Sequence, residues 1–274
     1  MPELPEVETI RRQLDPKVAG RKISAVEIGL PRLIKYPDVE SFCRLLEGQT
    51  ILQLERRGKY LLFRLADGRM LVIHLRMTGR LYYQSIDEPR DKFTHIVFKL
   101  DNGFELRYAD IRTLGTLELV TESELPRLKG LHGMGPEPLT EAFDLIYFSE
   151  LMSKRKGKVK ALLLDQRWIG GLGNIYVDES LALAGIHPER LANSLNADEV
   201  SRLYEAINRV IKEGIEHGGT SFRDYVDGEG KAGQHQQHLR VYGRKKQPCR
   251  ICGTTIERHE VAGRGTYYCP HCQK

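Results

Sequence analysis

The sequence lacks any apolar run that approaches the roughly 18 residues needed to span a membrane. It has no internal repeat and no low-complexity tract. Its first residues, Met1 to Glu6, are acidic and proline-rich, unlike a secretory signal. We therefore expect a cytoplasmic protein that does not associate with a membrane.

The sequence does contain enough apolar residues for hydrophobic cores, with 41% hydrophobic and 29% charged residues in 274 positions, a length that favours two domains. Its net charge of +5 is modest, but the cations gather in two clusters. The first comprises Lys154, Arg155, Lys156, Lys158 and Lys160, and the second Arg240, Arg244, Lys245, Lys246, Arg250, Arg258 and Arg264. Clustered cations suit a polyanion, although a solvated face explains either cluster alone equally well.

Hydrophobic periodicity changes at a segment rich in glycine and proline, residues 133–138. Before it, the pattern predicts helices over 5–19 and about 38–47. From residue 22 to 120 it otherwise predicts mostly strand, for example over 23–28, 60–65, 70–75, 96–100 and 104–108. After it, the pattern predicts helices over 145–153, 158–167, 175–185 and 197–216, then a polar stretch over 218–238. The predicted fold class is α+β, with an N-terminal antiparallel β-sandwich led by a helix.

Four cysteines form two Cys-x2-Cys pairs, Cys249 with Cys252 and Cys269 with Cys272, separated by sixteen residues. This spacing is typical of a zinc site, and disulfides are the weaker alternative in a chain without a signal peptide. Four thiolates complete the tetrahedron and leave no position for water, so the zinc is structural. We expect the tip of the resulting hairpin at residues 261–266, where glycines flank Arg264 and let the backbone approach a phosphate.

A glycine-rich turn, residues 170–173, joins two of the predicted helices, and Asn174 can cap the second. Free amides at a helix start bind anions. An ordinary turn between helices explains the same residues equally well, although the first cation cluster just upstream adds weight to phosphate binding.

Removal of Met1 would expose Pro2 as a free secondary amine. An α-amine has a pKa about two units below that of lysine, so its neutral, nucleophilic fraction near pH 7 is about a hundredfold larger. A secondary amine also forms an iminium that stays charged and acts as an electron sink. Glu3 and Glu6 lie close enough in sequence to shuttle protons. The alternative is a helix start that favours proline and glutamate for capping.

Residues 2–9, 171–179 and the four-cysteine ribbon together resemble formamidopyrimidine-DNA glycosylases, bacterial base-excision repair enzymes also called 8-oxoguanine DNA glycosylases. The resemblance runs nearly end to end and includes residues 56–60, 74–77, 135–138 and 241–244. The related endonuclease VIII, which prefers oxidised pyrimidines, usually has glycine where this chain has Leu4. A rival from another class is a non-catalytic zinc-ribbon protein that binds nucleic acid. Such a protein would not require a free amine on Pro2.

The resemblance implies that Pro2 attacks the sugar C1′ and forms a Schiff base, with Glu3 as proton donor. Lys59 assists elimination and Arg264 the second elimination. The positions implied to contact DNA are His74, Met77, Phe93, Arg112, Leu114, Arg155 and Asn174. The base pocket is implied to comprise Glu6, Thr220, Ser221, Phe222, Arg223 and Tyr225.

The chain departs from the family at two of these positions. A flipped nucleotide leaves a space in the duplex, which the family fills with a methionine, an arginine and a phenylalanine. Met77 and Arg112 match, but the phenylalanine is replaced by Leu114, and Phe93 stands where a histidine is often found. Leucine can wedge between bases but cannot stack as a flat ring.

The resemblance also implies the organisation of the chain. We expect a catalytic β-sandwich over 1–135, a helix–two-turn–helix domain over 136–240 and a zinc-ribbon hairpin over 241–274, acting as a monomer on damaged or abasic double-stranded DNA in a bacterial nucleoid. The implied reaction is base excision followed by β- and δ-elimination, with one structural zinc and neither a catalytic metal nor an organic cofactor.

Overall fold

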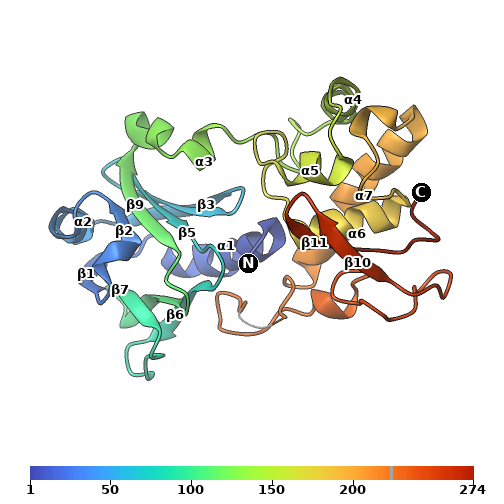
Figure 1. Ribbon diagram of the computed structural model, residues 1–274. Helices are drawn as coiled ribbons and strands as arrows, with labels where there is room; N and C mark the ends of the chain where they lie inside the picture. The colour runs from blue at the N-terminus through green and yellow to red at the C-terminus, as the bar shows by residue number, and fades with distance from the viewer. Residues whose placement is uncertain (223–224) are drawn as a thin grey trace. The chain divides into compact units, whose positions relative to one another are not determined.

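The computed structural model describes residues 1–222 and 225–274 (Figure 1). The chain divides into two compact units. The first comprises Met1–His132 together with His217–Gln234, and the second comprises Gly133–Glu216 together with His235–Lys274. The expected domain limits at residues 135 and 240 stay a prediction, since compactness does not show which segments fold independently.

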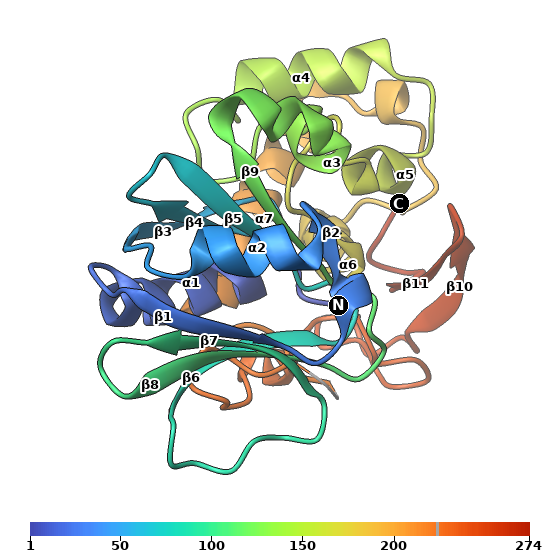
Figure 2. The same ribbon diagram turned by 90° about the vertical axis from the view of Figure 1, so that its left-hand side faces the viewer.

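The first unit contains two β-sheets, which lie in separate layers in Figure 2. One sheet has the order β1-β7-β8-β6, and its strands are β1 (Ile23–Ile28), β6 (Gly79–Ser85), β7 (Thr94–Leu100) and β8 (Phe104–Asp110). The other has the order β2-β9-β5-β4-β3, with strands β2 (Ile34–Tyr36), β3 (Ile51–Arg57), β4 (Tyr60–Leu65), β5 (Arg69–His74) and β9 (Thr116–Thr121). Neighbouring strands are antiparallel except β2 and β9, which run parallel.

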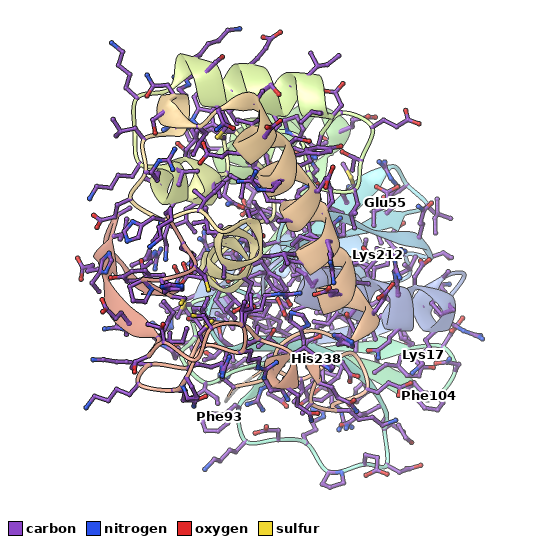
Figure 3. All side chains as sticks on the ribbon, turned by 90° about the vertical axis from the view of Figure 1, so that its right-hand side faces the viewer. Lys17, Glu55, Phe93, Phe104, Lys212 and His238 are labelled. Atoms are coloured by element: carbon purple, nitrogen blue, oxygen red, sulfur yellow. The ribbon has the colours of Figure 1, made fainter. Side chains whose placement is uncertain are left out.

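Helix α1 (Leu4–Val18) packs into the core of the first unit. Its fully buried apolar residues recur at helical spacing and join one hydrophobic cluster with residues of both sheets. These residues are Val7, Ile10, Leu14 and Val18. Near the far end of α1, the Lys17 ammonium lies 5.8 Å from the centre of the Tyr83 ring, which stacks on Phe104; Lys17 and Phe104 are labelled in Figure 3. The start of the chain is therefore attached to both β-sheets of the first unit.

Short helices complete the first unit. Helix α2 (Val39–Leu46) is capped by Asp38, whose carboxylate accepts the backbone N–H of Ser41. Three further short segments are η1 (Pro31–Leu33), η2 (Glu122–Arg127) and α3 (Lys129–His132).

The second unit is mainly helical and ends in a β-hairpin. Its helices are α4 (Leu145–Lys154), α5 (Val159–Leu164), α6 (Asn174–Ala184) and α7 (Ala197–Glu216), with short 3-10 turns η3 (Ala192–Ser194) and η4 (His235–Gln237). Strands β10 (Glu257–Val261) and β11 (Arg264–Tyr268) pair antiparallel. The predicted α+β class is confirmed. Helix α5 ends three residues earlier than expected, because the chain turns at Asp165.

Candidate functional site

The beginning of α1 gathers three of the expected site residues. Pro2, Glu3 and Glu6 are all buried, whereas Met1 is 46% exposed. The backbone N–H of Glu3 donates to Glu6 Oε2 at 2.8 Å, which fixes the first turn of the helix. The structure thus holds two carboxylates within a few residues of the Pro2 nitrogen. In this chain that nitrogen is part of the amide bond to Met1, so its use as an amine requires removal of Met1.

The segment His217–Gln234 packs against the same helix. The backbone N–H of Thr220 donates to Glu6 Oε1 at 2.7 Å, and the Tyr225 hydroxyl donates to the carbonyl oxygen of Glu6 at 3.3 Å. Ser221 donates its hydroxyl to the carbonyl of Tyr225 at 2.8 Å, while Phe222 is half exposed. The structure therefore brings most of the expected base pocket together; Arg223 lies outside the described residues.

Lys59 and His74 are both buried in the first unit. Lys59 lies in the turn between β3 and β4, and His74 is the last residue of β5. Burial, followed by the positive charges of Arg76 and Lys59, lowers the pKa of His74 to about 3. His74 Nδ1 accepts the backbone N–H of Arg76 at 3.0 Å. Neutral His74 therefore carries its proton on Nε2, which makes that nitrogen a hydrogen-bond donor suited to a phosphate oxygen.

Two neighbouring loops of the first unit present the expected wedge residues. Met77, in the loop before β6, is 38% exposed, and Leu114, in the loop before β9, is 48% exposed. Arg112 is also exposed. Large apolar side chains at exposed loop tips have no structural role in the core, and an apolar wedge between DNA bases is one use for them.

Phe93 lies just before β7 and is partly exposed. Its backbone N–H donates to Asp91 Oδ1 at 2.8 Å, and the Lys92 ammonium lies 5.0 Å from the centre of its ring. Figure 3 labels its side chain. A flat ring beside a cation suits contact with a nucleotide.

In the second unit, α5 and α6 are joined to the terminal hairpin by a buried polar network. Lys160 Nζ donates to Asp178 Oδ1 at 2.6 Å and to Thr266 Oγ1 at 2.7 Å, with both charged side chains fully buried. Asp178 Oδ2 accepts the backbone N–H of Tyr267 at 2.9 Å. Lys160 is therefore not part of a cationic surface, which corrects its place in the first cation cluster. In the same cluster, Lys158 pairs with Glu189.

The start of α6 differs from the sequence-based expectation. The N-cap is Gly173 and not Asn174, which is the first helical residue. The Asn174 side chain instead donates Nδ2 to the carbonyl of Gly265 at 2.8 Å, so it fastens the hairpin to the helix start. Arg155 is exposed at the end of α4 and lies 3.8 Å from the centre of the Trp168 ring.

The four cysteines of the ribbon form a compact cluster. Their sulfur atoms all lie within 4.8 Å of one another. The Cys249 and Cys272 sulfurs are 3.9 Å apart, and the Cys252 and Cys269 sulfurs are 3.5 Å apart. A tetrahedral zinc with Zn–S bonds of about 2.3 Å requires sulfur separations of about 3.8 Å. The donor set and its spacing therefore fit one structural Zn²⁺.

The hairpin turn follows Val261, which pairs with Arg264 across the ladder. Ala262 and Gly263 both have positive φ, at 53° and 70°, as a two-residue type I′ turn requires. Arg264 is exposed directly beyond this turn, as the sequence predicted. None of the described helices combines the length and apolar character needed to span a membrane.

The buried acids at the start of α1, the exposed wedge residues and the thiolate ribbon define a class: enzymes that act on nucleic acid and carry a structural zinc. Family models described as "Formamidopyrimidine-DNA glycosylase N-terminal domain", "Formamidopyrimidine-DNA glycosylase H2TH domain" and "Zinc finger found in FPG and IleRS" match residues 1–117, 134–226 and 246–274. The chain belongs to the formamidopyrimidine-DNA glycosylase family.

Relatives with this name cover the whole chain. A formamidopyrimidine-DNA glycosylase from Desulforamulus reducens is 52% identical over 100% of this chain and 99% of its own length. One from Geobacillus kaustophilus is 50% identical over 100% of both chains. Among solved structures, a Lactococcus lactis FPG mutant bound to Fapy-dG-containing DNA has a TM-score of 0.92 and 42% identity, with 100% of both chains covered. The same organism's Fpg bound to abasic-site DNA has a TM-score of 0.92 and 42% identity, with 99% of both covered.

Proposed function

We propose that this protein is a bifunctional DNA glycosylase and AP lyase that excises oxidised purines, 8-oxoguanine and formamidopyrimidines, from duplex DNA. Membership of the family and relatives solved with Fapy-dG and abasic-site DNA support this proposal. The observation that carries it is the pair of buried carboxylates, Glu3 and Glu6, beside Pro2. Both carboxylates accept backbone N–H bonds, which fix their positions, and they follow a latent secondary amine directly in the chain.

The reaction begins with the neutral amine of Pro2, after removal of Met1. The amine attacks C1′, the bond from C1′ to the base breaks, and the departing base takes a proton from solvent. Glu3 carries the proton that the Pro2 nitrogen loses to the ring oxygen as the sugar opens. This leaves a charged iminium at C1′, which acidifies C2′.

Strand cleavage follows from that iminium. Loss of a C2′ proton expels the 3′ phosphate, and a second elimination expels the 5′ phosphate, which leaves a one-nucleotide gap with phosphate at both ends. Water then releases the sugar remnant and regenerates the amine. We assign assistance in elimination to Lys59 and assistance in the second elimination to Arg264.

The remaining residues bind DNA in this proposal. Damaged bases must leave the stack before C1′ can be reached. The proposed DNA contacts are His74, Met77, Phe93, Arg112, Leu114, Arg155 and Asn174, and the proposed base pocket is Glu6, Thr220, Ser221, Phe222, Arg223 and Tyr225. Residues 1–135 form the catalytic domain with Pro2, Glu3 and Lys59, residues 136–240 supply DNA contacts and most of the base pocket, and residues 241–274 supply the zinc ribbon with Arg264.

The four cysteines hold the zinc, which supplies folding energy to the ribbon and no chemistry to the reaction. An amine and a carboxylate provide the nucleophile and the proton transfers, so the proposed reaction needs neither a catalytic metal nor an organic cofactor. The protein acts as a monomer in the bacterial cytoplasm, where its chromosomal substrate lies.

Borohydride trapping tests the proposal. The protein is incubated with duplexes that contain 8-oxoguanine, a formamidopyrimidine, an oxidised pyrimidine or an abasic site. Reduction of the iminium should give a covalent adduct that maps to Pro2. A matched protein with one extra residue that blocks the amine should give none, and undiminished trapping by it would overturn the role of Pro2.

The same panel separates the rival functions. A non-catalytic zinc-ribbon protein would bind duplexes and trap none of them. An endonuclease VIII-like enzyme would act fastest on the oxidised pyrimidine. That lesion belongs in the panel because the Lactococcus lactis relative has been solved with oxidised-pyrimidine-containing DNA, at a TM-score of 0.91.

A further inference from the structure

Asp110, the last residue of β8, is almost completely buried and its carboxylate accepts hydrogen bonds from two separate loops. Oδ1 accepts the Thr78 hydroxyl at 2.6 Å and the Arg112 backbone N–H at 3.2 Å. Oδ2 accepts the Gly115 backbone N–H at 2.9 Å and the Tyr108 hydroxyl at 3.2 Å. Because all these partners can donate N–H or O–H bonds, the site suits an ionised, acceptor-only carboxylate.

The two loops leave neighbouring strands at the same edge of one sheet. Gly79, the first residue of β6, pairs with Asp110 in the β6–β8 ladder. Thr78 immediately precedes β6 and follows Met77 in the chain. The second loop, residues 111–115, carries Arg112 and Leu114 and is bonded to Asp110 at two of its backbone N–H groups. One carboxylate thus connects all three proposed wedge residues.

Each loop contains a strained residue directly before its apolar tip. Arg76 has a φ of 54° and precedes Met77, and Thr113 has a φ of 52° and precedes Leu114. Left-handed backbone is unfavourable for residues other than glycine and persists only where the surroundings enforce it. Hydrogen bonds to an ionised group are stronger than neutral ones, so Asp110 supplies the constraint that both loops need.

The Tyr108 side chain packs closely against the backbone of both loops. A Cβ added to Gly115 would lie 1.6 Å from the Tyr108 hydroxyl, and one added to Gly79 would lie 2.7 Å from it. Both loops therefore meet the same side chain at close range. The same hydroxyl donates to the Asp110 carboxylate. Tyr108 therefore contacts both the backbone of the loops and the carboxylate that binds them.

We propose that Asp110 is the positioning residue of the wedge: its carboxylate locks the loop of Met77 and the loop of Arg112 and Leu114 into one arrangement before DNA binds. The inference rests on the proposed function. A preorganised wedge loses less loop entropy when it enters the duplex, so extrusion and excision of the damaged base should be faster with it.

Asp110→Asn tests this inference. The amide keeps the volume but is uncharged and has only one acceptor oxygen. The Gly115 N–H then loses its partner or its charge-assisted bond, whereas the Arg112 N–H loses charge assistance but still donates to Thr78 Oγ1 at 3.0 Å. Single-turnover excision of 8-oxoguanine opposite cytosine should fall about tenfold or more. Borohydride trapping on a single-stranded abasic oligonucleotide should stay within about twofold of wild type, because a single strand has no duplex to open.

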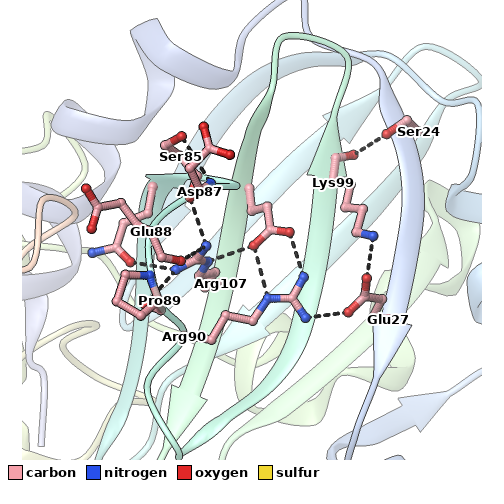
Figure 4. Close-up of polar contacts among 11 residues, drawn as sticks. Ser24, Glu27, Ser85, Asp87, Glu88, Pro89, Arg90, Lys99 and Arg107 are labelled. Atoms are coloured by element: carbon pink, nitrogen blue, oxygen red, sulfur yellow. Dashed lines mark hydrogen bonds and ion pairs between the residues drawn. The ribbon is translucent and has the colours of Figure 1, made fainter.

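Glu105→Gln is the matched control. Glu105 is a fully buried carboxylate on the same strand, and it accepts hydrogen bonds from Arg90 and Arg107. Both arginines are labelled in Figure 4. Arg107 in turn donates to the carbonyl oxygen of Ser85, the last residue of β6, and to that of Glu88 in the loop that follows. This variant removes the same charge without touching either wedge loop, so the ratio of duplex excision to single-strand trapping should not change.

Thr78→Val provides a second variant should Asp110→Asn fail to fold. It keeps the side-chain volume but removes a hydroxyl that donates to Asp110 and accepts the Arg112 backbone N–H at 3.0 Å. Because the Asp110 carboxylate keeps its charge, this variant should lower the same ratio by a smaller factor. The inference is overturned if the ratio is unchanged in the variant that folds, or falls equally in Glu105→Gln. Failure of the proposed function itself is distinguishable, since wild-type protein would then fail to excise 8-oxoguanine.

Discussion

Thr220 donates its backbone N–H to Glu6 across 214 positions of sequence, at 2.7 Å. The other carboxylate oxygen of Glu6 accepts the backbone N–H of Glu3 at 2.8 Å. A single buried side chain therefore connects the segment that forms the proposed base pocket to the residue proposed as proton donor. Movement at one end of this connection alters the geometry at the other.

Glu6→Gln should slow base excision. A glutamine has one acceptor oxygen, so it cannot accept from both backbone N–H groups. Loss of a hydrogen bond to a charged group costs about 1.5–3 kcal/mol, which corresponds to about ten- to a hundredfold in rate. Single-turnover excision from an 8-oxoguanine duplex measures the effect. Glu40→Gln, on the exposed first turn of α2, is the control, and a rate within about twofold of wild type for Glu6→Gln would contradict the prediction.

His74 should make folding sensitive to mild acid. Its folded pKa of about 3 lies below the ordinary value of 6.5, so below pH 6.5 the unfolded chain binds a proton that the folded chain does not. The contribution of neutral His74 to the free energy of unfolding is complete above pH 6.5 and is lost as the pH falls towards 3. Each pH unit in this window lowers the free energy of unfolding by about 1.4 kcal/mol, so the loss at pH 4.5 is about 2–3 kcal/mol.

Urea unfolding of wild type and His74→Gln between pH 7 and 4.5 measures this contribution. As the pH falls, the free energy of unfolding should decrease more steeply for wild type than for the variant. The difference between the two separates the effect of His74 from that of the other histidines. Burial raises the pKa of Glu8, but hydrogen bonds from Arg11 and Arg12 and the charge of Arg56 lower it to about 2. Protonation of Glu8 therefore affects the free energy of unfolding only below the pH range of this experiment. Parallel curves would show that the imidazole is not held neutral by the fold.

Loss of zinc should unfold the ribbon and spare the first unit. Cys249→Ser removes one of four ligands, and the ribbon depends on the metal for its fold. Affinity for a lesion duplex should fall at least about tenfold, while the β-rich circular dichroism of the first unit is retained. Cys43→Ser, outside the cluster, should retain both zinc and affinity. Normal binding by Cys249→Ser would mean that the ribbon does not hold DNA.

The parts of the fold that sequence predicted are those with regular periodicity. Helix α1 was predicted to within a residue at each end, because Val7, Ile10, Leu14 and Val18 recur at helical spacing. Strand β3 lies in the region predicted to be mostly strand, but its limits were not predicted, since its burial does not alternate and its register shifts between Ile51 and Gln53. The parallel pairing of β2 with β9 joins segments about eighty residues apart, which no local pattern reveals.

The site shows the same division. The zinc ligands and Pro2 carry signals in spacing and position, so sequence identified them as candidates. Asp110 was missed, because its role depends on the β6–β8 register that brings Thr78 to it. Lys160 was misjudged for a similar reason: a lysine in a cationic run looks exposed until its partner, Asp178, is known. Both roles depend on contacts between different strands or helices, which the periodicity of a single element does not reveal.

Leu114 offers the most specific test of the wedge. Its side chain is 48% exposed, so substitution should change DNA binding far more than folding. An aromatic ring stacks on a base with about 1–3 kcal/mol by alanine substitution, and leucine offers only apolar contact. Leu114→Phe should therefore tighten binding to lesion duplexes and Leu114→Ala should weaken it, each by about tenfold or less.

Affinity and excision rate for 8-oxoguanine opposite cytosine should be measured for all three residues at position 114. Single-stranded substrate should respond less, because it has no opposite base to hold. Ile111→Ala is the matched control, since Ile111 is a 40% exposed apolar residue of the same loop that the proposal does not use. Equal values for phenylalanine, leucine and alanine would mean that residue 114 never enters the helix. The wedge would then depend on Met77 and Arg112 alone, and the shared anchoring of both loops by Asp110 would matter chiefly through those two side chains.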